Sequence, residues 1–253
     1  MIDMKRILLI AAAVALTSCQ LIFNVNEIGN GISVQTPIEV SEFSSISSRC
    51  SLDIYYTQSD KDQSVLLTCD ENLVDLFDIR VEEGVLIVDT KGGGYSTKIK
   101  IYATITSPKL SSIKLSGSGD CNITGPITTD GDFSFKVSGS GDIDADGAVI
   151  CKNFTASVSG SGDIEVAGVQ AQAADFKDSG SGDIEVDALT AEDISVRMSG
   201  SGDITLKCKD AGYIDASLSG SGDLNLSGTA RSIKSNTTGS GNVKSGNLTI
   251  IRQ

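Results

Sequence analysis

Histidine and tryptophan are absent from the 253-residue sequence, and only three residues are proline. Without histidine the chain can form no Ser-His-Asp triad, no Cys-His nucleophile pair and no histidine-ligated zinc site. Any acid–base chemistry would therefore depend on aspartate, glutamate, lysine, tyrosine or cysteine side chains.

Positive charge is scarce as well. The 20 lysine and arginine residues are outnumbered by 33 aspartate and glutamate residues, which gives a net charge of −13. We expect no nucleic-acid partner, because the sequence shows no basic stripe that would displace counterions from phosphates. Anionic lipid headgroups are equally poor candidates as ligands.

Long hydrophobic runs are also missing, and the apolar run near the N-terminus, Ile7–Leu16, is too short to span a bilayer as a helix. It follows a short basic segment and ends in the tetrapeptide Leu16–Cys19, which resembles a bacterial lipobox. The resemblance implies a lipoprotein signal peptide over residues 1–18 and lipidation of Cys19. Several acyl chains, at about 0.8 kcal/mol per buried methylene, would hold the protein on a membrane. An ordinary secretory signal is the alternative.

Five cysteines follow Cys19. They are Cys50, Cys69, Cys121, Cys151 and Cys208. The odd number leaves at least one thiol unpaired in a monomer, although an exported protein meets an oxidising environment in which disulfides form. Cys50 and Cys69 are the best candidate pair, because they flank a predicted hairpin of strands 52–57 and 64–68. The alternative is that both are small apolar side chains in a core.

The pentapeptide Ser-Gly-Ser-Gly-Asp recurs through the second half of the chain. Its copies are Ser116–Asp120, Ser138–Asp142, Ser159–Asp163, Ser179–Asp183, Ser199–Asp203 and Ser219–Asp223, followed by an altered copy, Thr238–Asn242. The first glycines of successive copies are 19 to 22 residues apart. A period near twenty indicates a stacked solenoid, in which each unit buries its apolar side only against its neighbours.

Apolar and polar residues alternate within each repeat. In one copy, the residues two before and four after the first glycine are Val137 and Ile143, whereas serine and aspartate occupy the odd positions between them. Alternation with a period of two is typical of β-strands, and a strand–helix–strand unit would need about 30 residues. The repeat therefore predicts an all-β fold, a parallel β-helix with about 20 residues per coil and seven regular coils over residues 111–253.

The segment before the repeats is less regular. We expect residues 19–36 to form a tether and residues 37–110 to form irregular first coils that cap the solenoid, so that residues 37–253 make one domain. The strands predicted from β-branched and aromatic residues are 38–43, 46–57, 64–68, 79–81, 85–89 and 97–106. Asp70 is predicted to be the N-cap of a short helical turn.

Stacking the coils about 4.8 Å apart turns each position of the repeat into a column. The inward glycines either bend the chain at a corner, which we favour, or make room for a bulky side chain from the opposite wall. The outward aspartates form a column of their own, here called the aspartate column. It consists of Asp120, Asp142, Asp163, Asp183, Asp203 and Asp223.

Neighbouring carboxylates in the aspartate column repel each other by about 1 kcal/mol per pair in water. Hydrogen bonds from backbone N–H groups or serine hydroxyls of the corner would offset that repulsion, and this is the structural role that we favour. Bound calcium, or a face on which these aspartates contact carbohydrate, are the alternatives. The calcium-binding nonapeptide Gly-Gly-x-Gly-x-Asp has a different period and a double glycine that is missing here.

Asp178 departs from an inward column. It stands two residues before the first glycine, where other repeats carry leucine, valine or methionine. An inward carboxylate there would be costly unless hydrogen-bonded, and it would mark a site. We expect instead that the repeat shifts locally and that Asp178 points outward.

Parallel β-helices also include polysaccharide lyases, hydrolases and acyltransferases. Hexapeptide acyltransferases need a catalytic histidine, which this chain lacks, and hydrolases need a local cluster of carboxylates in a groove. Here the carboxylates recur evenly in every coil, which favours a role for the whole fold. We therefore expect no catalytic residues, with a lyase that uses lysine, arginine and calcium as the remaining enzymatic alternative.

The lipobox, the irregular β-rich first half and the iterated Ser-Gly-Ser-Gly-Asp-Ile coils together resemble the putative auto-transporter adhesin, head GIN domain family, over residues 37–245. The resemblance implies an exported, lipid-anchored protein of the Bacteroidetes group, a right-handed β-helix without recognised catalytic residues, and a role in adhesion. Gln20 is not the aspartate that retains lipoproteins in the inner membrane, so the resemblance also favours the outer membrane.

Three hypotheses follow for the function. The first is a non-enzymatic, lipid-anchored envelope protein whose repetitive Ser/Asp face binds glycans, other envelope proteins or its own copies. The second is a carbohydrate-active enzyme, and the third is a calcium-stabilised spacer. Calcium is the only cofactor that any of the three requires.

Overall fold

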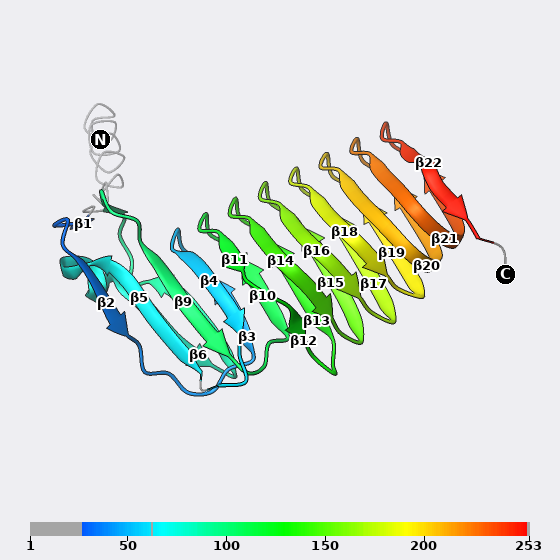
Figure 1. Cartoon of the computed structure of the whole chain (residues 1–253). Coiled ribbons are helices and arrows are strands. Elements are labelled where there is room, and N and C mark those ends of the chain that lie inside the picture. Colours follow the sequence, from blue (N-terminus) through cyan, green and yellow to red (C-terminus); the bar gives the residue numbers. More distant parts are fainter. Residues whose placement is uncertain (1–26, 62, 252–253) are drawn as a thin grey trace, which may run out of the picture.

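The protein is seen here in a computed structural model that describes residues 27–61 and 63–251. The predicted signal peptide and Cys19 lie outside these residues. Most strands run parallel in stacked coils, and the result is an elongated β-solenoid with two long faces (Figure 1). Within the described ranges, no helix has the length and apolar character needed to cross a membrane.

Each coil contributes one strand to each face. The first face is formed, in spatial order, by β7 (Val85–Thr90), β3 (Ser45–Ser48), β10 (Ser112–Leu115), β13 (Phe133–Val137), β15 (Asn153–Val158), β17 (Ala173–Asp178) and β19 (Asp193–Met198). The second face is formed by β9 (Tyr102–Ser107), β4 (Asp53–Gln58), β11 (Cys121–Ile123), β14 (Ile143–Ile150), β16 (Ile164–Gln170) and β18 (Ile184–Thr190).

The last coils are built from longer strands. Strands β20 (Ile204–Leu218) and β21 (Leu224–Thr237) run from the second face into the first face of the next coil, and β22 (Val243–Ile250) is the last strand of the second face. The short β12 (Ile127–Thr128) pairs with the end of β14 at the far edge. The predicted parallel β-solenoid is therefore confirmed.

At the N-terminal end, the coils are not stacked in chain order. The coil of β3 and β4 lies between the coil of β7 and β9 on one side and the coil of β10 and β11 on the other, although β7 and β9 come later in the chain than β3 and β4. Residues 45–58 therefore begin the regular stack, and the chain inserts a further coil beneath them before it continues.

Antiparallel strands close this end of the solenoid. Strand β2 (Ser33–Pro37) pairs with β5 (Ser64–Asp70), β5 pairs with β9, and β6 (Phe77–Glu82) pairs with β7. Strands β1 (Glu27–Ile28) and β8 (Tyr95–Ser96) pair with each other. Residues 27–36 are thus part of the cap, and the prediction that they belong to a tether is wrong.

Three further predictions for the first half need correction. Strands β4 and β5 form no hairpin, because β9 lies between them and pairs with both. Residues 38–43 form no strand. The predicted helical turn is present as the 3₁₀ helix η1 (Glu71–Leu76), but the Asp70 side chain does not cap it. Buried Asp70 instead accepts hydrogen bonds from the Gly31 N–H, at 2.6 Å, and from the Thr97 hydroxyl, and so holds the first strands against the cap.

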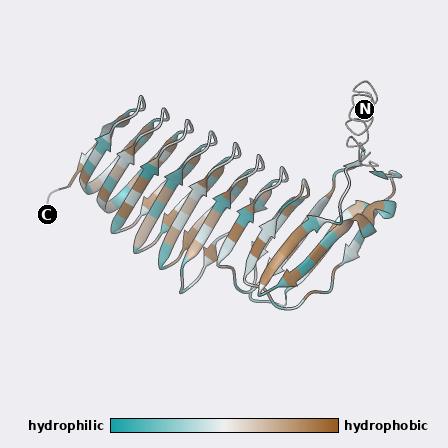
Figure 2. Cartoon of the chain, turned by 180° about the vertical axis from the view of Figure 1, so that it is seen from behind, coloured by the Kyte–Doolittle hydropathy of each residue, from teal (hydrophilic) through white to brown (hydrophobic). Residues whose placement is uncertain are grey.

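The interior of the solenoid is filled by apolar side chains from both faces. Hydrophobic and hydrophilic residues alternate along the strands, as expected for a sheet with one dry side (Figure 2). Phe133, Phe135, Phe154 and Phe176 are fully buried, and their ring centroids are 4.9 to 6.5 Å apart where the rings pair. A filled core leaves only the outer surface for binding.

Candidate functional site

The repeated pentapeptide forms the corner that joins the first face to the second face. In one coil, Val137 ends β13 and Ile143 begins β14, so residues 138–142 make the corner. The corners stack on each other at one edge of the molecule (Figure 1). The N–H of Ser161 donates to the carbonyl oxygen of Gly139 at 2.9 Å, and equivalent bonds recur in the following coils.

Close stacking explains the two glycines of each corner. A Cβ atom on Gly139 or Gly141 would overlap the carbonyl oxygen of the preceding corner, and the same holds for every later copy. These glycines do not have the positive φ angles that favour glycine elsewhere in the chain. The corner interpretation is thus correct, and the missing side chains make room for the neighbouring backbone, not for a bulky residue of the opposite wall.

The aspartate column completes the hydrogen bonding of the corners. The Oδ1 atom of Asp142 accepts the backbone N–H of Asp163 at 2.8 Å, and Asp163 accepts that of Asp183 at 2.7 Å. The remaining members repeat this bond from coil to coil, at 2.7 to 3.0 Å. A charged acceptor makes a strong hydrogen bond, which offsets the repulsion between neighbouring carboxylates. The second oxygen, Oδ2, makes no such bond.

The column extends one residue beyond each end of the predicted set. At the cap, Asp53 accepts the N–H of Asp120 at 3.2 Å. At the other end, Asn242 donates its backbone N–H and its side-chain amide to Asp223, and Lys244 contacts the same carboxylate at 2.6 Å. Lys244 and Asn242 lower the pKa of Asp223 to about 2.

Asp53 is a structural residue that the sequence analysis missed. The signal was present, because Ser51-Leu52-Asp53-Ile54 matches the end of the repeat with leucine in place of glycine. Cys50 and Leu52 replace the two glycines in this first corner, where the coil beneath comes from the irregular cap.

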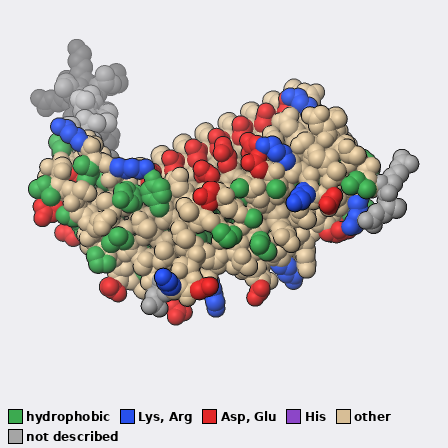
Figure 3. Space-filling view, in the orientation of Figure 1, with side chains coloured by type: hydrophobic (Ala, Val, Ile, Leu, Met, Phe, Trp, Pro, Cys, Tyr) green, Lys and Arg blue, Asp and Glu red, His purple; other side chains and the backbone are tan. Residues whose placement is uncertain are grey.

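A second set of carboxylates lies next to the aspartate column on the second face. Asp144, Glu165 and Glu185 are register partners on β14, β16 and β18, and we call them the carboxylate row. Figure 3 shows the acidic side chains gathered on this face. Partial burial and the charges of Asp144 and Glu185 raise the pKa of Glu165. The next register position is Thr205, so the row ends at Glu185, which binds Lys207 at 3.0 Å.

Asp178 points inward, so the predicted outward shift is wrong. It is 2% exposed and keeps its register between Val158 and Met198. Its Oδ1 atom accepts the Gly180 N–H at 2.8 Å, whereas Oδ2 is buried without a hydrogen-bond partner. Burial, together with the charges of nearby aspartates, raises the pKa of Asp178 to about 6. A neutral carboxylic acid fits this environment better than a carboxylate.

The five cysteines of the described residues are free thiols. Cys50 and Cys69, the candidate pair, are not bonded to each other, since β9 lies between β4, which follows Cys50, and β5, which contains Cys69. Both pack in or against the apolar core, as the alternative interpretation expects. Burial raises the pKa values of Cys69, Cys151 and Cys208 to about 11, and that of Cys121 further. All four thiols are therefore protonated at neutral pH and poorly reactive.

Metal binding was an alternative for the acidic columns. Within residues 27–61 and 63–251, no three His, Cys, Asp or Glu side chains converge in a way that could hold a metal ion. The aspartates of the column are spread along the solenoid axis, one per coil, and each is already engaged with its neighbour's backbone. Calcium binding stays an untested prediction.

The fold and its surface define a class of protein: a parallel β-solenoid with a largely apolar interior, on whose outer surface charged side chains form rows with one residue per coil. The family model described as putative auto-transporter adhesin, head GIN domain, matches residues 42–211 and 193–252. The chain therefore belongs to this family, as its resemblance implied.

Solved structures of similar proteins have the same fold. A putative adhesin from Bacteroides fragilis has 27% sequence identity and a TM-score of 0.76, over 86% of this chain and 98% of that one. A putative lipid binding protein from Parabacteroides distasonis has 26% identity and a TM-score of 0.73, over 87% and 98% of the two chains. Among curated proteins, none matches this chain.

Proposed function

We propose that the protein is a non-enzymatic, lipid-anchored protein of the bacterial outer membrane that acts as an adhesin and binds glycans or other envelope proteins. The observation that carries the proposal is the arrangement of the outer surface. The interior is filled by apolar side chains, and the polar groups are presented outside in register, one per coil. Such a surface suits a repetitive or extended partner, which contacts several coils at once.

The second face is the binding surface in this proposal. The aspartate column uses Oδ1 within the fold and, except at Asp223, where Lys244 binds Oδ2, leaves Oδ2 for a partner. The carboxylate row lies beside it. Carboxylates and the exposed corner serines offer hydrogen-bond acceptors and donors to the hydroxyl groups of a glycan or to the polar surface of a protein. The sequence prediction of a Ser/Asp face is thus extended by the three residues of the carboxylate row.

The test uses the carboxylate row, because changing the aspartate column would also disturb the fold. In a triple variant, Asp144→Asn, Glu165→Gln and Glu185→Gln, we expect binding to cells or to an array of glycans and envelope proteins to fall at least tenfold. The matched control removes three exposed carboxylates outside both proposed surfaces, with Glu39→Gln, Glu71→Gln and Asp75→Asn. Unchanged binding by the row variant, or an equal loss in the control, contradicts the proposal.

The membrane anchor is tested separately at Cys19. Replacing Cys19 by alanine should abolish incorporation of radiolabelled palmitate and release the protein from the outer-membrane fraction. The Cys50→Ala variant is the control, since Cys50 is a half-buried thiol of the folded domain. Labelling that persists in Cys19→Ala would show that the lipobox prediction is wrong.

A further inference from the structure

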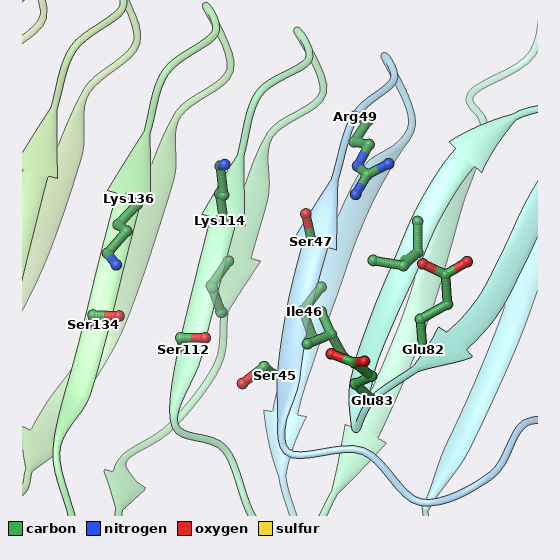
Figure 4. Close-up of a pocket in the computed structure, with 13 residues that line it drawn as sticks. Ser45, Ile46, Ser47, Arg49, Glu82, Glu83, Ser112, Lys114, Ser134 and Lys136 are labelled. Carbon is green, nitrogen blue, oxygen red and sulfur yellow. The ribbon is translucent and has the colours of Figure 1, made fainter.

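A hollow of about 830 Å³ lies on the first face, where the cap meets the regular coils. Strands β3, β7, β10 and β13 line it, together with the β6–β7 turn (Figure 4). Arg49, Lys114 and Lys136 are its basic residues, and all three side chains are exposed. We call this hollow the cation groove. It lies on the face opposite to the carboxylate row.

Lys114 and Lys136 stand side by side without an acidic partner. They are register partners on β10 and β13, which places their backbones about 4.8 Å apart. Among the described residues, neither lysine forms a salt bridge, and Arg49 forms none either. In a chain of net charge −13, adjacent like charges that are left uncompensated point to a ligand that supplies the missing negative charge.

The same row provides an internal comparison further along the solenoid. Lys177 and Arg197 are also register partners, but both bind the carboxylate of Asp175, which lies two residues before Lys177. The positions equivalent to Asp175 in the cation groove are Ser112 and Ser134. In the groove, serine hydroxyl groups therefore stand where Asp175 neutralises the cations further along the row. Hydroxyl groups both donate and accept hydrogen bonds, which suits a ligand that carries hydroxyl groups as well as negative charge.

The remaining walls limit what fits. Val85 and Ile87 provide an apolar floor beside the serines, and Glu82 and Glu83 stand at the cap end. Arg80 binds Glu82 at 2.8 Å, so Glu83 is the uncompensated carboxylate of the groove. An anion therefore meets Arg49, which directly follows β3, and the lysines of β10 and β13, and it is repelled at the β6–β7 turn.

We propose that the cation groove binds an acidic polysaccharide, a glycan chain whose carboxylates contact Arg49, Lys114 and Lys136 while its hydroxyls contact the serines. A glycan chain of this kind offers carboxylates to the cations and hydroxyl groups to the serines, which matches the mixed lining of the groove. Single-stranded DNA also offers one negative charge per unit but few hydroxyl groups, so it matches only the cations of the groove. The inference deepens the proposed function, since it names a glycan class, but it uses a separate surface.

The experiment measures binding of the full-length protein to polygalacturonate, with the fully methyl-esterified polymer as the uncharged probe and a single-stranded DNA as a polyanion of another class. We expect binding to polygalacturonate alone, and an affinity that falls as salt is raised from 50 to 200 mM. Lys114→Gln with Lys136→Gln should weaken binding at least tenfold. The matched control, Lys177→Gln with Arg197→Gln, removes two cations of the same row and should stay within twofold of the parent.

Several outcomes overturn the inference. They are equal binding by the Lys114/Lys136 variant and the parent, an equal loss in the Lys177/Arg197 control, equal binding of the esterified polymer, and DNA binding as tight as that of polygalacturonate. The carboxylate-row variant separates this inference from the proposed function. This variant should keep its polygalacturonate binding. If it loses cell binding while the Lys114/Lys136 variant keeps both cell binding and polygalacturonate binding, the proposed function stands and the inference about the groove is wrong.

Discussion

At the residue scale, the corner positions require glycine because successive coils pack too closely to leave room for a side chain. We predict that Gly162→Ala lowers the free energy of unfolding by about 3 kcal/mol, because the new Cβ would overlap the Gly141 carbonyl oxygen and push two corners apart. Gly246→Ala is the matched control, since a Cβ there meets no atom within 4 Å. Urea denaturation measures both. Equal small effects would contradict the close-approach explanation.

Asp178 makes the stability of the protein depend on pH. Its pKa is raised from 3.8 to about 6 in the folded protein, so between about pH 4 and 6 the folded state binds more protons than the unfolded state. The free energy of unfolding should therefore decrease as pH rises through this window, by about 3 kcal/mol in total for a shift of about two pKa units. At pH 7, the free energy of unfolding is therefore lowered by the full cost of ionising the buried Asp178 carboxyl.

The Asp178→Asn variant isolates this effect, because the amide oxygen can still accept the Gly180 N–H but the side chain does not titrate. We expect the difference in unfolding free energy between parent and variant to change by about 3 kcal/mol from pH 4 to pH 7. Urea denaturation across this range gives the difference directly. A constant difference would show that Asp178 does not change its protonation on unfolding.

At the scale of the element, each corner depends on an acceptor supplied by the corner before it. We predict that Asp163→Ala lowers the free energy of unfolding by about 1–2 kcal/mol, because the Asp183 N–H loses its partner. Asp163→Asn should lose less than half of that, since its amide oxygen can replace Oδ1. Ser161→Ala, an exposed change in the same corner, is the control. If Asn and Ala lose equally, the charge matters more than the hydrogen bond.

The strands that repeat could be predicted from the sequence, because alternation and a fixed period both follow from stacking identical coils. Val137, Ile143 and their equivalents point inward as expected. The aspartate column was also recognised, including hydrogen bonding to the backbone as its favoured role. The close approach of successive backbones could not be recognised from the sequence. The sequence shows that glycine recurs, but it does not show that a carbonyl oxygen of the preceding corner lies where the side chain would be.

The cap and the cation groove could not be predicted, for a different reason. The position of β9 between β4 and β5, and of the β3–β4 coil above the β7–β9 coil, depends on pairings between segments far apart in sequence. Lys114 and Lys136 lie in separate repeats, and their lack of acidic partners becomes visible only when the first face is assembled. The prediction for Asp178 was wrong because it assumed that a charged side chain would turn outward, whereas the register with Val158 and Met198 keeps it inward.

At the scale of the whole molecule, the two faces differ in charge although one repeat generates both. The second face carries the aspartate column and the carboxylate row, whereas the first face carries cations that are neutralised along β17 and β19 and free along β10 and β13. These outward residues do not affect the packing of the core, since their side chains do not enter it. Binding specificity can therefore vary coil by coil while the solenoid stays the same.

The same independence predicts that a whole coil can be removed. Deleting residues 164–183 joins Asp163 to Ile184 and restores the motif Ser-Gly-Ser-Gly-Asp-Ile, so each strand of the shortened chain meets a partner of the same register. Because coils contact only their neighbours, we expect a folded, cooperative protein with a modestly lower melting temperature. Deleting 164–173, half a coil, should prevent folding, since it reverses which strands follow the corner.

A second whole-coil deletion, of residues 204–223, provides the matched comparison. It joins Asp203 to Leu224 and also keeps the repeat intact, but it leaves Asp178 in place. Circular dichroism melting curves of both variants should show the same β-rich state. Only the 164–183 deletion removes the carboxyl of Asp178. The decrease in stability between pH 4 and 6 should therefore be absent from that variant and persist in the 204–223 deletion. If neither shortened chain folds, the coils are not interchangeable units, and stability depends on contacts beyond the neighbouring coil.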